Sequence, residues 1–287
     1  MAKLIFGCGY LGNRVAALWR AAGEEVFAIT RSPQRAENWR AAGLSPLVAD
    51  ITDPATLRGL PQVETVLFAV GYDRSSGQPI ENVYRQGLVN VLEQLPPPAR
   101  FIYISSTGVY GQVAGDWVDE DAPCRPQRAG GVACLQAEQT LQASPLAART
   151  IVLRLAGIYG PGRIPRADDI RSGKPIDAPG DGYLNLIHVD DAARIVVATE
   201  QLPAPRSYVV SDGQPVLRRD YYGELARLLG AEPPQFTAPP VDSPAAQRAG
   251  SDKRVRPTRL FADLPLKLQY PDYRAGLAAI VQSSATG

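Results

Sequence analysis

The sequence predicts a doubly wound α/β fold, in which helices cover both faces of a parallel sheet. Short apolar runs alternate with helical patterns over the first 155 residues, an order that is typical of such sheets. Runs such as Val66–Val70 are apolar without interruption, which indicates strands that are buried on both faces. A glycine-rich turn after the first run opens the first helix. We therefore expect the site to lie beyond the carboxyl ends of the strands.

Six strands and five helices are predicted in the first half of the chain. The strands are Leu4–Phe6, Val26–Thr30, Leu47–Ala49, Thr65–Val70, Phe101–Ser105 and Ile151–Leu155. The helices cover residues 11–22, 33–42, 54–59, 80–95 and 131–143. Beyond about residue 156, glycine and proline interrupt the regular pattern. There we expect helices over Asp190–Gln201 and 219–229 and a strand over Tyr208–Ser211.

These elements predict a division into two parts. Residues 1–155 are expected to form a nucleotide-binding domain, and residues 156–287 a smaller substrate-binding region, in which 190–211 returns to the main sheet. Loops that follow the strands are the expected site: Gly7–Gly12, Thr30–Arg35, Asp50–Asp53, Gly71–Gly77, Ser105–Gly111 and Ala156–Arg163.

The stretch Gly7–Gly12 has the spacing G-x-G-x-x-G. In a strand-turn-helix, the first glycine permits a tight turn and the second lets the backbone approach a pyrophosphate. The third lets the helix pack close to the sheet, and the helix N-terminus offers free N–H groups and a partial positive charge. The spacing alone is weak evidence, because glycines also cluster in ordinary turns. With a strand before it and a helix after it, the stretch favours a dinucleotide site on a Rossmann-type sheet.

The end of the second predicted strand bears on which nucleotide binds. A site for NAD usually has an acidic residue there, which binds the ribose 2′-hydroxyl, whereas this strand runs into Arg31-Ser32. The Arg31 guanidinium suits a 2′-phosphate, and Ser32 and Arg35 are further donors. Solvated arginines at a helix start are the alternative, which the helix dipole disfavours. We therefore expect NADP, with NAD as the alternative.

Composition excludes several other functions. Thirty basic and 29 acidic residues leave a net charge of +1, so no overall field attracts nucleic acid or a membrane surface. The densest basic cluster, Lys253 to Arg259, is expected to be a solvated surface. Three scattered cysteines and one histidine predict neither a disulfide framework nor a metal site. Residues 1–20 lack the pattern of a secretory signal, and no apolar run has membrane-spanning length, so a cytoplasmic location is expected.

Several segments together resemble the extended short-chain dehydrogenase/reductase family, the NAD(P)-dependent epimerases and dehydratases. Besides the glycine loop, they are Asp50-Ile51, Phe101–Gly111, Leu153–Arg163 and Ile187–Ala193, in the family's order. The resemblance implies that Asp50-Ile51 lies near the adenine, and that the protein is a homodimer with a small-molecule substrate. The residues expected to bind the cofactor are then Gly7, Gly9, Tyr10, Leu11, Gly12, Arg31, Ser32, Arg35, Asp50, Ile51, Val70 and Gly71.

The family's catalytic pair, however, is missing. The family needs a tyrosine and a lysine four residues apart on one helix, because the ammonium lowers the pKa of the phenol. The corresponding positions here are Gly130 and Cys134, and none of the four lysines lies four residues after a tyrosine. What remains is Ser106, with Thr107 beside it, and a serine at a strand end is often only a turn residue. We therefore expect very slow turnover of ordinary sugar-nucleotide, alcohol or ketone substrates.

Four other residues are weaker candidates. Tyr110 and Tyr159 are expected to serve packing, and His188 to be a hydrogen-bonded structural imidazole, with Asp190 as an N-cap. In addition, Tyr72, Asp73 and Arg74 follow the fourth strand, where a nicotinamide or substrate would lie.

Three functions remain open. The first is an atypical NADP-dependent oxidoreductase or epimerase whose proton donor has moved. The second is a protein that binds NADP(H), or senses its redox state, without turnover. The third, a flavoprotein, is disfavoured, because such sites also usually have an acid at the end of the second strand. No residue identifies the substrate.

Overall fold

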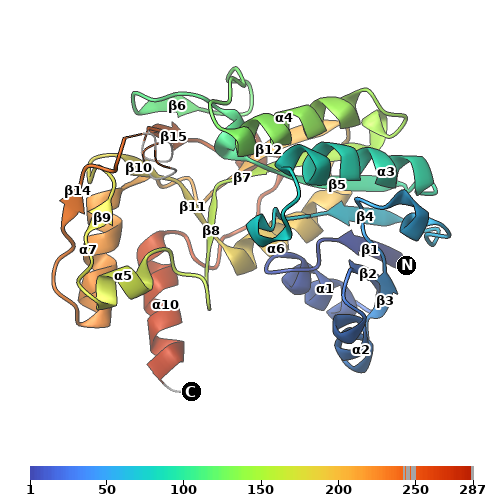
Figure 1. The fold of residues 1–287 in the computed structure, drawn as a ribbon, viewed down its shortest axis with the longest axis horizontal. Coiled ribbons are helices and arrows are strands. Elements are labelled where there is room, and N and C mark those ends of the chain that lie inside the picture. Colours follow the sequence, from blue (N-terminus) through green and yellow to red (C-terminus); the bar gives the residue numbers. More distant parts are fainter. Residues whose placement is uncertain (242, 244–245, 247–249, 286–287) are drawn as a thin grey trace. The chain divides into compact units, whose positions relative to one another are not determined.

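The structure is a computed structural model that describes residues 1–241, 243, 246 and 250–285. The chain divides into two compact units (Figure 1). Unit 1 consists of Met1–Val109, Pro126–Arg154 and Ala193–Tyr208, and unit 2 of Tyr110–Arg125, Leu155–Ala192 and Val209–Gly287. In both units, no helix of the described residues is long and apolar enough to cross a membrane.

The main sheet confirms the predicted fold class. It has seven strands in the order β12-β7-β5-β4-β1-β2-β3, and the pairs from β5 to β3 are parallel. The bounds are β1 (Ala2–Phe6), β2 (Glu25–Thr30), β3 (Ser45–Val48), β4 (Thr65–Phe68), β5 (Arg100–Ser106), β7 (Thr150–Leu155) and β12 (Arg206–Val210). Each predicted strand is present, and its ends differ from the predicted ones by at most two residues. The strand order reverses between β1 and β4, where sheets of this kind bind ligands.

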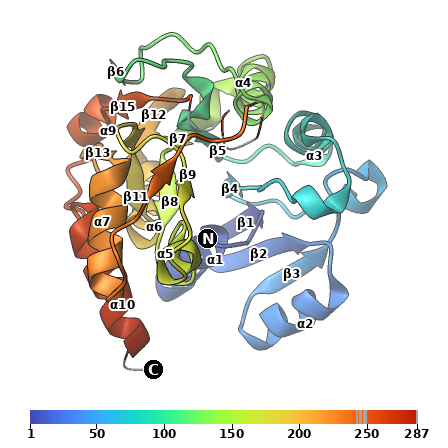
Figure 2. The same cartoon turned by 60° about the vertical axis from the view of Figure 1, so that its left-hand side comes forward.

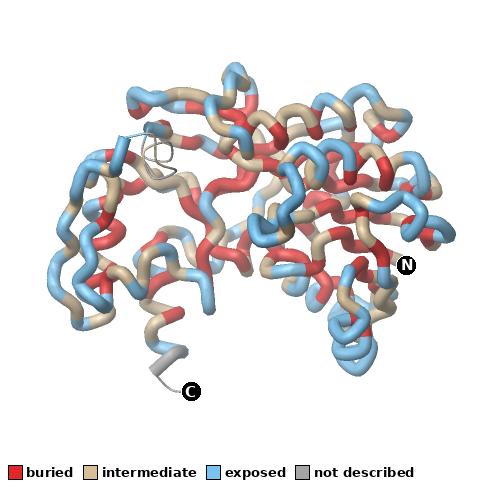
Figure 3. Tube along the Cα trace, in the orientation of Figure 1, coloured by how far each residue is buried: buried red, intermediate tan, exposed pale blue. Residues whose placement is uncertain are grey.

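Helices cover the two faces of this sheet because alternate residues of each strand point to opposite sides. Leu4 and Phe6 of β1 pack in a core with α3 (Gly87–Gln94) and α4 (Ala129–Gln142) (Figures 1 and 2). Ile5, between them, faces Gly12 of α1 (Gly12–Ala21). The fourth helix of this part is α2 (Pro33–Ala41). The central strands are buried along most of their length (Figure 3).

Two predicted helices differ from the observed ones. The segment predicted as a helix over 54–59 is a four-residue 3₁₀ turn, Pro54–Leu57, which Asp53 caps by accepting from the Ala55 N–H. The predicted helix over 80–95 begins with a π-helical turn, Asn82–Gln86, before α3. Such π-helical turns frequently occur at functional sites.

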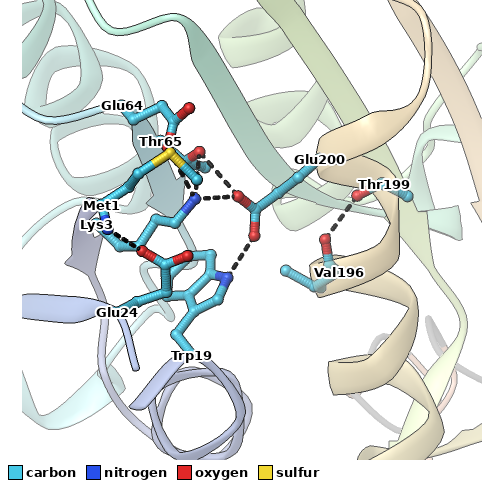
Figure 4. A network of polar contacts seen from close by, with 9 residues as sticks. All are labelled: Met1, Lys3, Trp19, Glu24, Glu64, Thr65, Val196, Thr199 and Glu200. Carbon is cyan, nitrogen blue, oxygen red and sulfur yellow. Dashed lines mark hydrogen bonds and ion pairs between the residues drawn. The ribbon is translucent and has the colours of Figure 1, made fainter. Parts of the chain in front are cut away.

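At the opposite end of the sheet, a buried ionic network ties the β1 strand to the segment that follows α6 (Val189–Ala198) (Figure 4). The Lys3 ammonium lies 2.5 Å from Glu200 Oε2 and donates to Thr65 Oγ1 at 3.2 Å. The same carboxylate accepts from Thr65 Oγ1 at 2.9 Å and from the indole N–H of Trp19. The carboxylate of Glu200 therefore binds side chains from three elements of unit 1, which are β1, β4 and α1.

Unit 2 contains short strands around an aromatic core. Its described residues form four two-stranded sheets, which pair β10 with β13, β11 with β8, β14 with β9 and β15 with β6. The strands are β6 (Asp116–Val118), β8 (Gly157–Tyr159), β9 (Ile176–Asp177), β10 (Tyr183–Leu184), β11 (Leu186–His188), β13 (Val216–Leu217), β14 (Phe236–Thr237) and β15 (Lys253–Val255). Among the described residues of unit 2 are the helices α5 (Ala167–Arg171), α7 (Arg218–Leu229), α9 (Thr258–Asp263) and α10 (Tyr273–Ala285). The predicted helices over 190–201 and 219–229 are present as α6 with its following 3₁₀ turn and as α7.

The basic cluster in unit 2 is only partly the solvated surface predicted, because Arg256 is exposed but Lys253 is not. Lys253 is buried, and its ammonium donates to the Tyr110 carbonyl at 3.1 Å and to Ser251 Oγ at 3.0 Å. The guanidinium groups of Arg254 and Arg256 lie 4.9 and 4.5 Å from the centre of the Trp117 ring. The sequence did not indicate these contacts because Trp117 comes from a strand, β6, that lies far away along the chain.

Candidate functional site

The glycine loop after β1 shows why each of its three glycines is needed. Gly7 has a φ of +87°, and a Cβ there would overlap the carbonyl of Ala69, just beyond β4. A Cβ on Gly12 would lie 2.5 Å from the Gly7 carbonyl oxygen, so α1 packs directly on the loop. At Gly9, by contrast, a Cβ would meet nothing within 4 Å. Gly7 and Gly12 therefore allow close packing, whereas Gly9 leaves open space above the backbone.

This open space suits a pyrophosphate. It lies at the start of α1, where the helix dipole places a partial positive charge, although the Asn13 N–H already donates to the Gly9 carbonyl at 2.9 Å. The first turn of α1 contains no acidic residue that would repel an anion. Beside it, Arg14 donates to the Tyr10 carbonyl at 2.8 Å and lies 4.4 Å from the centre of the Tyr10 ring. Leu11 is buried. The residues present therefore fit a dinucleotide phosphate group.

The Cys8 thiol within this loop is inert. It is buried and donates to Asn13 Oδ1 at 3.1 Å. Burial raises the pKa of Cys8 to about 12, against a smaller effect of Arg35 that lowers it. A thiol that stays protonated is a poor nucleophile.

The turn after β2 carries the three residues expected to bind a 2′-phosphate. Ser32 is the N-cap of α2, and its Oγ accepts from the Arg35 N–H at 3.2 Å. Arg31 and Arg35 are exposed. The Arg31 guanidinium lies 3.7 Å from Asp73, in the loop after β4. Hydrogen bonds from Ser75 lower the pKa of Asp73, and the positive charge of Arg31 lowers it further by a smaller amount. Arg31 is thus placed beside a helix N-terminus, with an exposed carboxylate as its present partner.

Asp50 and Ile51 have local structural roles. Asp50 Oδ1 accepts from the N–H and the hydroxyl of Thr52, at 2.9 and 2.8 Å. Ile51 is buried, and its carbonyl accepts from Asn90 Nδ2 at 2.8 Å. The structure thus fixes this turn against α3 and directs one oxygen of the carboxylate back into the turn.

Val70 and Gly71 begin the loop after β4. The built Cβ of Gly7 would lie 2.6 Å from the Val70 N–H nitrogen, so this loop and the glycine loop are in contact. Gly71 is exposed, and a Cβ there would meet nothing within 4 Å. The two loops on either side of the strand-order reversal are therefore in contact.

The positions of the missing catalytic pair lie in the first turns of α4. Gly130 is open, since its nearest neighbour for a Cβ is the Ile80 side chain at 3.8 Å. Cys134, one turn later, is buried, and burial raises its pKa to about 12, with Glu138 adding to the effect. Between them, Gly131 packs against the carbonyl of Gly108, where a Cβ would overlap. The pair position therefore carries neither an acid nor a cation.

A buried ion pair holds α4 on the sheet. Glu138 accepts from Arg154 Nη2 of β7 at 2.8 Å and from Ser105 Oγ of β5 at 2.5 Å. Ser106, the next residue, uses its Oγ to accept from the Gly108 N–H at 3.0 Å, as a turn residue does. Thr107 is buried. The Ser106 hydroxyl can still donate its proton, so its catalytic role stays a prediction.

Two tyrosines, Tyr72 and Tyr84, are in contact after β4. The sequence indicated only Tyr72 as a candidate site residue. The Tyr72 hydroxyl donates to the Gln78 carbonyl at 2.7 Å, within its own loop. Tyr84, in the π-helical turn, accepts from the Tyr72 N–H at 3.2 Å, and the two rings pack edge to face. Tyr84 was missed because it lies within a predicted helix. The sequence does not reveal that this segment forms a π-helical turn, so Tyr84 could not be told apart from a core residue of a regular helix.

The remaining candidates belong to unit 2. His188 is buried, its ring lies 3.8 Å from the Tyr270 ring, and Nδ1 accepts from the Asp190 N–H at 3.3 Å. The helix begins at Val189, so the imidazole caps it and Asp190 lies inside the first turn. The N-cap prediction for Asp190 is therefore wrong. Tyr159 is fully buried against His188, and Tyr110 is buried as well, so all three have structural surroundings.

Comparison with known proteins places this architecture in a family. The model of the NAD dependent epimerase/dehydratase family matches residues 4–211. Protein YeeZ of Escherichia coli (strain K12) is 30% identical over 282 residues, which cover 93% of this chain and 96% of that protein. A solved structure of a conserved protein of unknown function from Silicibacter pomeroyi DSS is 31% identical, with a TM-score of 0.79 and 99% of both chains covered.

A more distant structure has the same fold. The UDP-glucose 4-epimerase of Thermus thermophilus, solved as a complex with NAD, has a TM-score of 0.81 at 19% identity, with 98% of both chains covered. The family model spans the glycine loop, the turn after β2 and the Gly130 and Cys134 positions. The protein therefore belongs to the NAD dependent epimerase/dehydratase family.

Proposed function

We propose that the protein binds NADP(H) at the glycine loop and acts as an oxidoreductase or epimerase on a small molecule. The observation that carries this proposal is the open space above Gly9, at the N-terminus of α1 and at the reversal of the strand order. Family membership and the NAD complex of a protein with the same fold support it. When bound, the nicotinamide would supply or accept a hydride.

The preference for NADP(H) over NAD(H) rests on the turn after β2. A 2′-phosphate there would meet the Arg31 guanidinium and the N-terminus of α2, and no acidic residue follows β2 directly. The phosphate would have to displace Asp73 from Arg31. Both side chains are more than half exposed, and exposed pairs of this kind are weak. A dianionic phosphate is a stronger partner than one carboxylate for the same guanidinium.

The second candidate, a protein that binds NADP(H) without turnover, is favoured by one observation. Gly130 and Cys134 occupy the pair position, and neither transfers protons at neutral pH. NADPH oxidation across a panel of carbonyl compounds separates the two functions. Restored turnover only in a Gly130→Tyr, Cys134→Lys double variant would favour the binding protein, whereas turnover by the wild type would favour the enzyme.

Nucleotide preference provides the first test. Fluorescence titration is expected to show tighter binding of NADPH than of NADH. Arg31→Ala should weaken NADPH binding by about 1.5–3 kcal/mol, the range for a hydrogen bond to a charged group, and leave NADH binding nearly unchanged. Arg40→Ala, an exposed arginine at the other end of α2, is the control. Equal loss for both nucleotides in Arg31→Ala would contradict the 2′-phosphate assignment.

The glycine loop provides the second test. Gly9→Val should abolish binding of both nucleotides, because the side chain would fill the space that the pyrophosphate needs. Its fold should survive, since a Cβ there meets nothing within 4 Å and φ is not positive. Gly223→Val, another open glycine in unit 2, controls for the substitution itself. A folded Gly9→Val protein that still binds NADPH would show that the loop is only a turn.

A further inference from the structure

The pair position on α4 lacks a phenol, but a neighbouring segment supplies one. Tyr84 belongs to the π-helical turn before α3, and this turn packs against α4, the helix that carries Cys134. We propose that the Tyr84 hydroxyl is the relocated proton donor and acceptor of the reaction. This inference rests on the proposed function, in which a nicotinamide nucleotide binds at the glycine loop.

The position of the Tyr84 oxygen supports this role. It accepts a hydrogen bond from the backbone N–H of Tyr72, at the start of the loop that follows β4. That loop lies at the carboxyl edge of the sheet, where ligands of such folds bind. Among the residues that the structure describes, no hydrogen bond uses the Tyr84 hydroxyl proton. The oxygen is therefore held in place by the backbone while its proton remains to be donated.

The other phenols of unit 1 are less suited. The Tyr72 hydroxyl already donates to the Gln78 carbonyl. Tyr103 is 2% exposed within the core, and Tyr208 is fully buried. The Tyr10 ring is covered by the Arg14 guanidinium. Tyr84 alone among them combines partial exposure, a fixed oxygen and a place beside the vacant pair.

The surroundings of Tyr84 set the direction of proton transfer. Burial raises its pKa, Cys134 adds to this, and the Tyr72 N–H opposes both by stabilising the phenolate. The facing groups are Cys134 from α4, which stays a thiol, and Tyr103 from β5, whose pKa burial also raises. Tyr84 is therefore protonated at neutral pH and ready to donate. In a reduction, a bound nicotinamide would supply the hydride to the carbonyl carbon. Tyr84 would give its hydroxyl proton to the carbonyl oxygen and regain a proton from water.

A spectroscopic experiment tests this without any turnover. The protein is labelled with 3-fluorotyrosine, and its ¹⁹F resonances are titrated with pH in the absence and presence of NADP⁺. Loss of one resonance in Tyr84→Phe, and of another in Tyr72→Phe, assigns both phenols. The positive nicotinamide should lower the pKa of Tyr84 by about 1 unit or more.

Activity provides the second measurement. With 9,10-phenanthrenequinone as the carbonyl probe, Tyr84→Phe should lower kcat about 100-fold or more while the Kd for NADPH changes less than about twofold. Tyr222→Phe, which removes a phenol hydroxyl from the aromatic core of unit 2, is the matched control and should retain most of kcat. NADP⁺ that binds without moving the Tyr84 resonance or its pKa overturns the proposal. Failure of both nucleotides to bind overturns the proposed function itself, so the two failures are distinguishable.

Discussion

A buried carboxylate of unit 1 and one of unit 2 are stabilised in opposite ways. In unit 1, Glu200 accepts from Lys3, Thr65 and Trp19 (Figure 4). In unit 2, Asp212 follows β12 and accepts from the Gln214 N–H at 2.9 Å. Its second oxygen, Oδ2, is buried and has no hydrogen-bond partner among the described residues.

The two carboxylates differ in the charge and the hydrogen-bond donors around them. The Lys3 ammonium and the neutral donors around Glu200 stabilise a charged carboxylate. Around Asp212, burial raises the pKa to about 7, and Asp272 contributes in the same direction. In unit 1, Glu200 thus connects β1, α1 and β4 through hydrogen bonds and an ion pair. Unit 2 contains an acid that changes its charge near neutral pH, so its stability should depend on pH there.

The largest expected effect is that of breaking the tie in unit 1. Lys3→Met should lower the free energy of unfolding by about 3–5 kcal/mol, because it leaves the Glu200 carboxylate buried without its cation. Chemical denaturation at pH 7 measures this. The double variant Lys3→Met, Glu200→Gln should recover much of the loss, since it removes the charge as well. If the single and double variants lost equal stability, packing rather than charge would explain the effect.

A smaller effect, with a distinctive pH dependence, is expected at Asp212. A folded-state pKa of about 7, against the ordinary value of 3.8, means that the folded protein binds more protons than the unfolded chain between these pH values. The free energy of unfolding should therefore fall as pH rises from about 4 to about 7, by at most about 4 kcal/mol from this group. Asp212→Asn should remove that slope and stabilise the protein above pH 7.

Denaturation curves of the wild type and of Asp212→Asn at pH 5, 6, 7 and 8 test this. Asp272→Asn is a useful companion, because it removes a neighbouring charge while leaving the Asp212 carboxyl in place. It should reduce the slope without abolishing it. Parallel pH profiles for the wild type and Asp212→Asn would show that the carboxyl at 212 does not titrate in this range.

The contrast between neighbouring and distant contacts also explains what the sequence could predict. The strands around the glycine loop and the loop itself follow from local patterns, in which glycine spacing and apolar runs act over short stretches of chain. The Lys3–Glu200 contact joins residues 197 positions apart, and no local pattern indicates it. The same holds for the pairing of Arg31 with Asp73, which qualifies the prediction of a ready phosphate site.

Unit 2 was the least predictable part for a related reason. Its strands are two or three residues long, too short to show an alternation of apolar and polar residues. Their pairing is between distant segments, such as β15 with β6, which buries Lys253 and brings Trp117 to Arg254. The absence of the tyrosine and lysine on α4 could be read from the sequence, but the approach of Tyr84 to Cys134 could not.

The smallest expected effect concerns Glu64, the second acid near Lys3, and tests whether the Lys3 ammonium interacts mainly with Glu200. Glu64 Oε2 lies 3.5 Å from the Lys3 ammonium, but the Glu64 side chain is 39% exposed, against 9% for Glu200. Water therefore screens this contact, and Glu64→Gln should change the free energy of unfolding by less than about 1 kcal/mol. The change should shrink further in about 1 M salt. A loss as large as that of Lys3→Met would mean that the two carboxylates share the lysine equally, and that burial of Glu200 does not decide the strength of the tie.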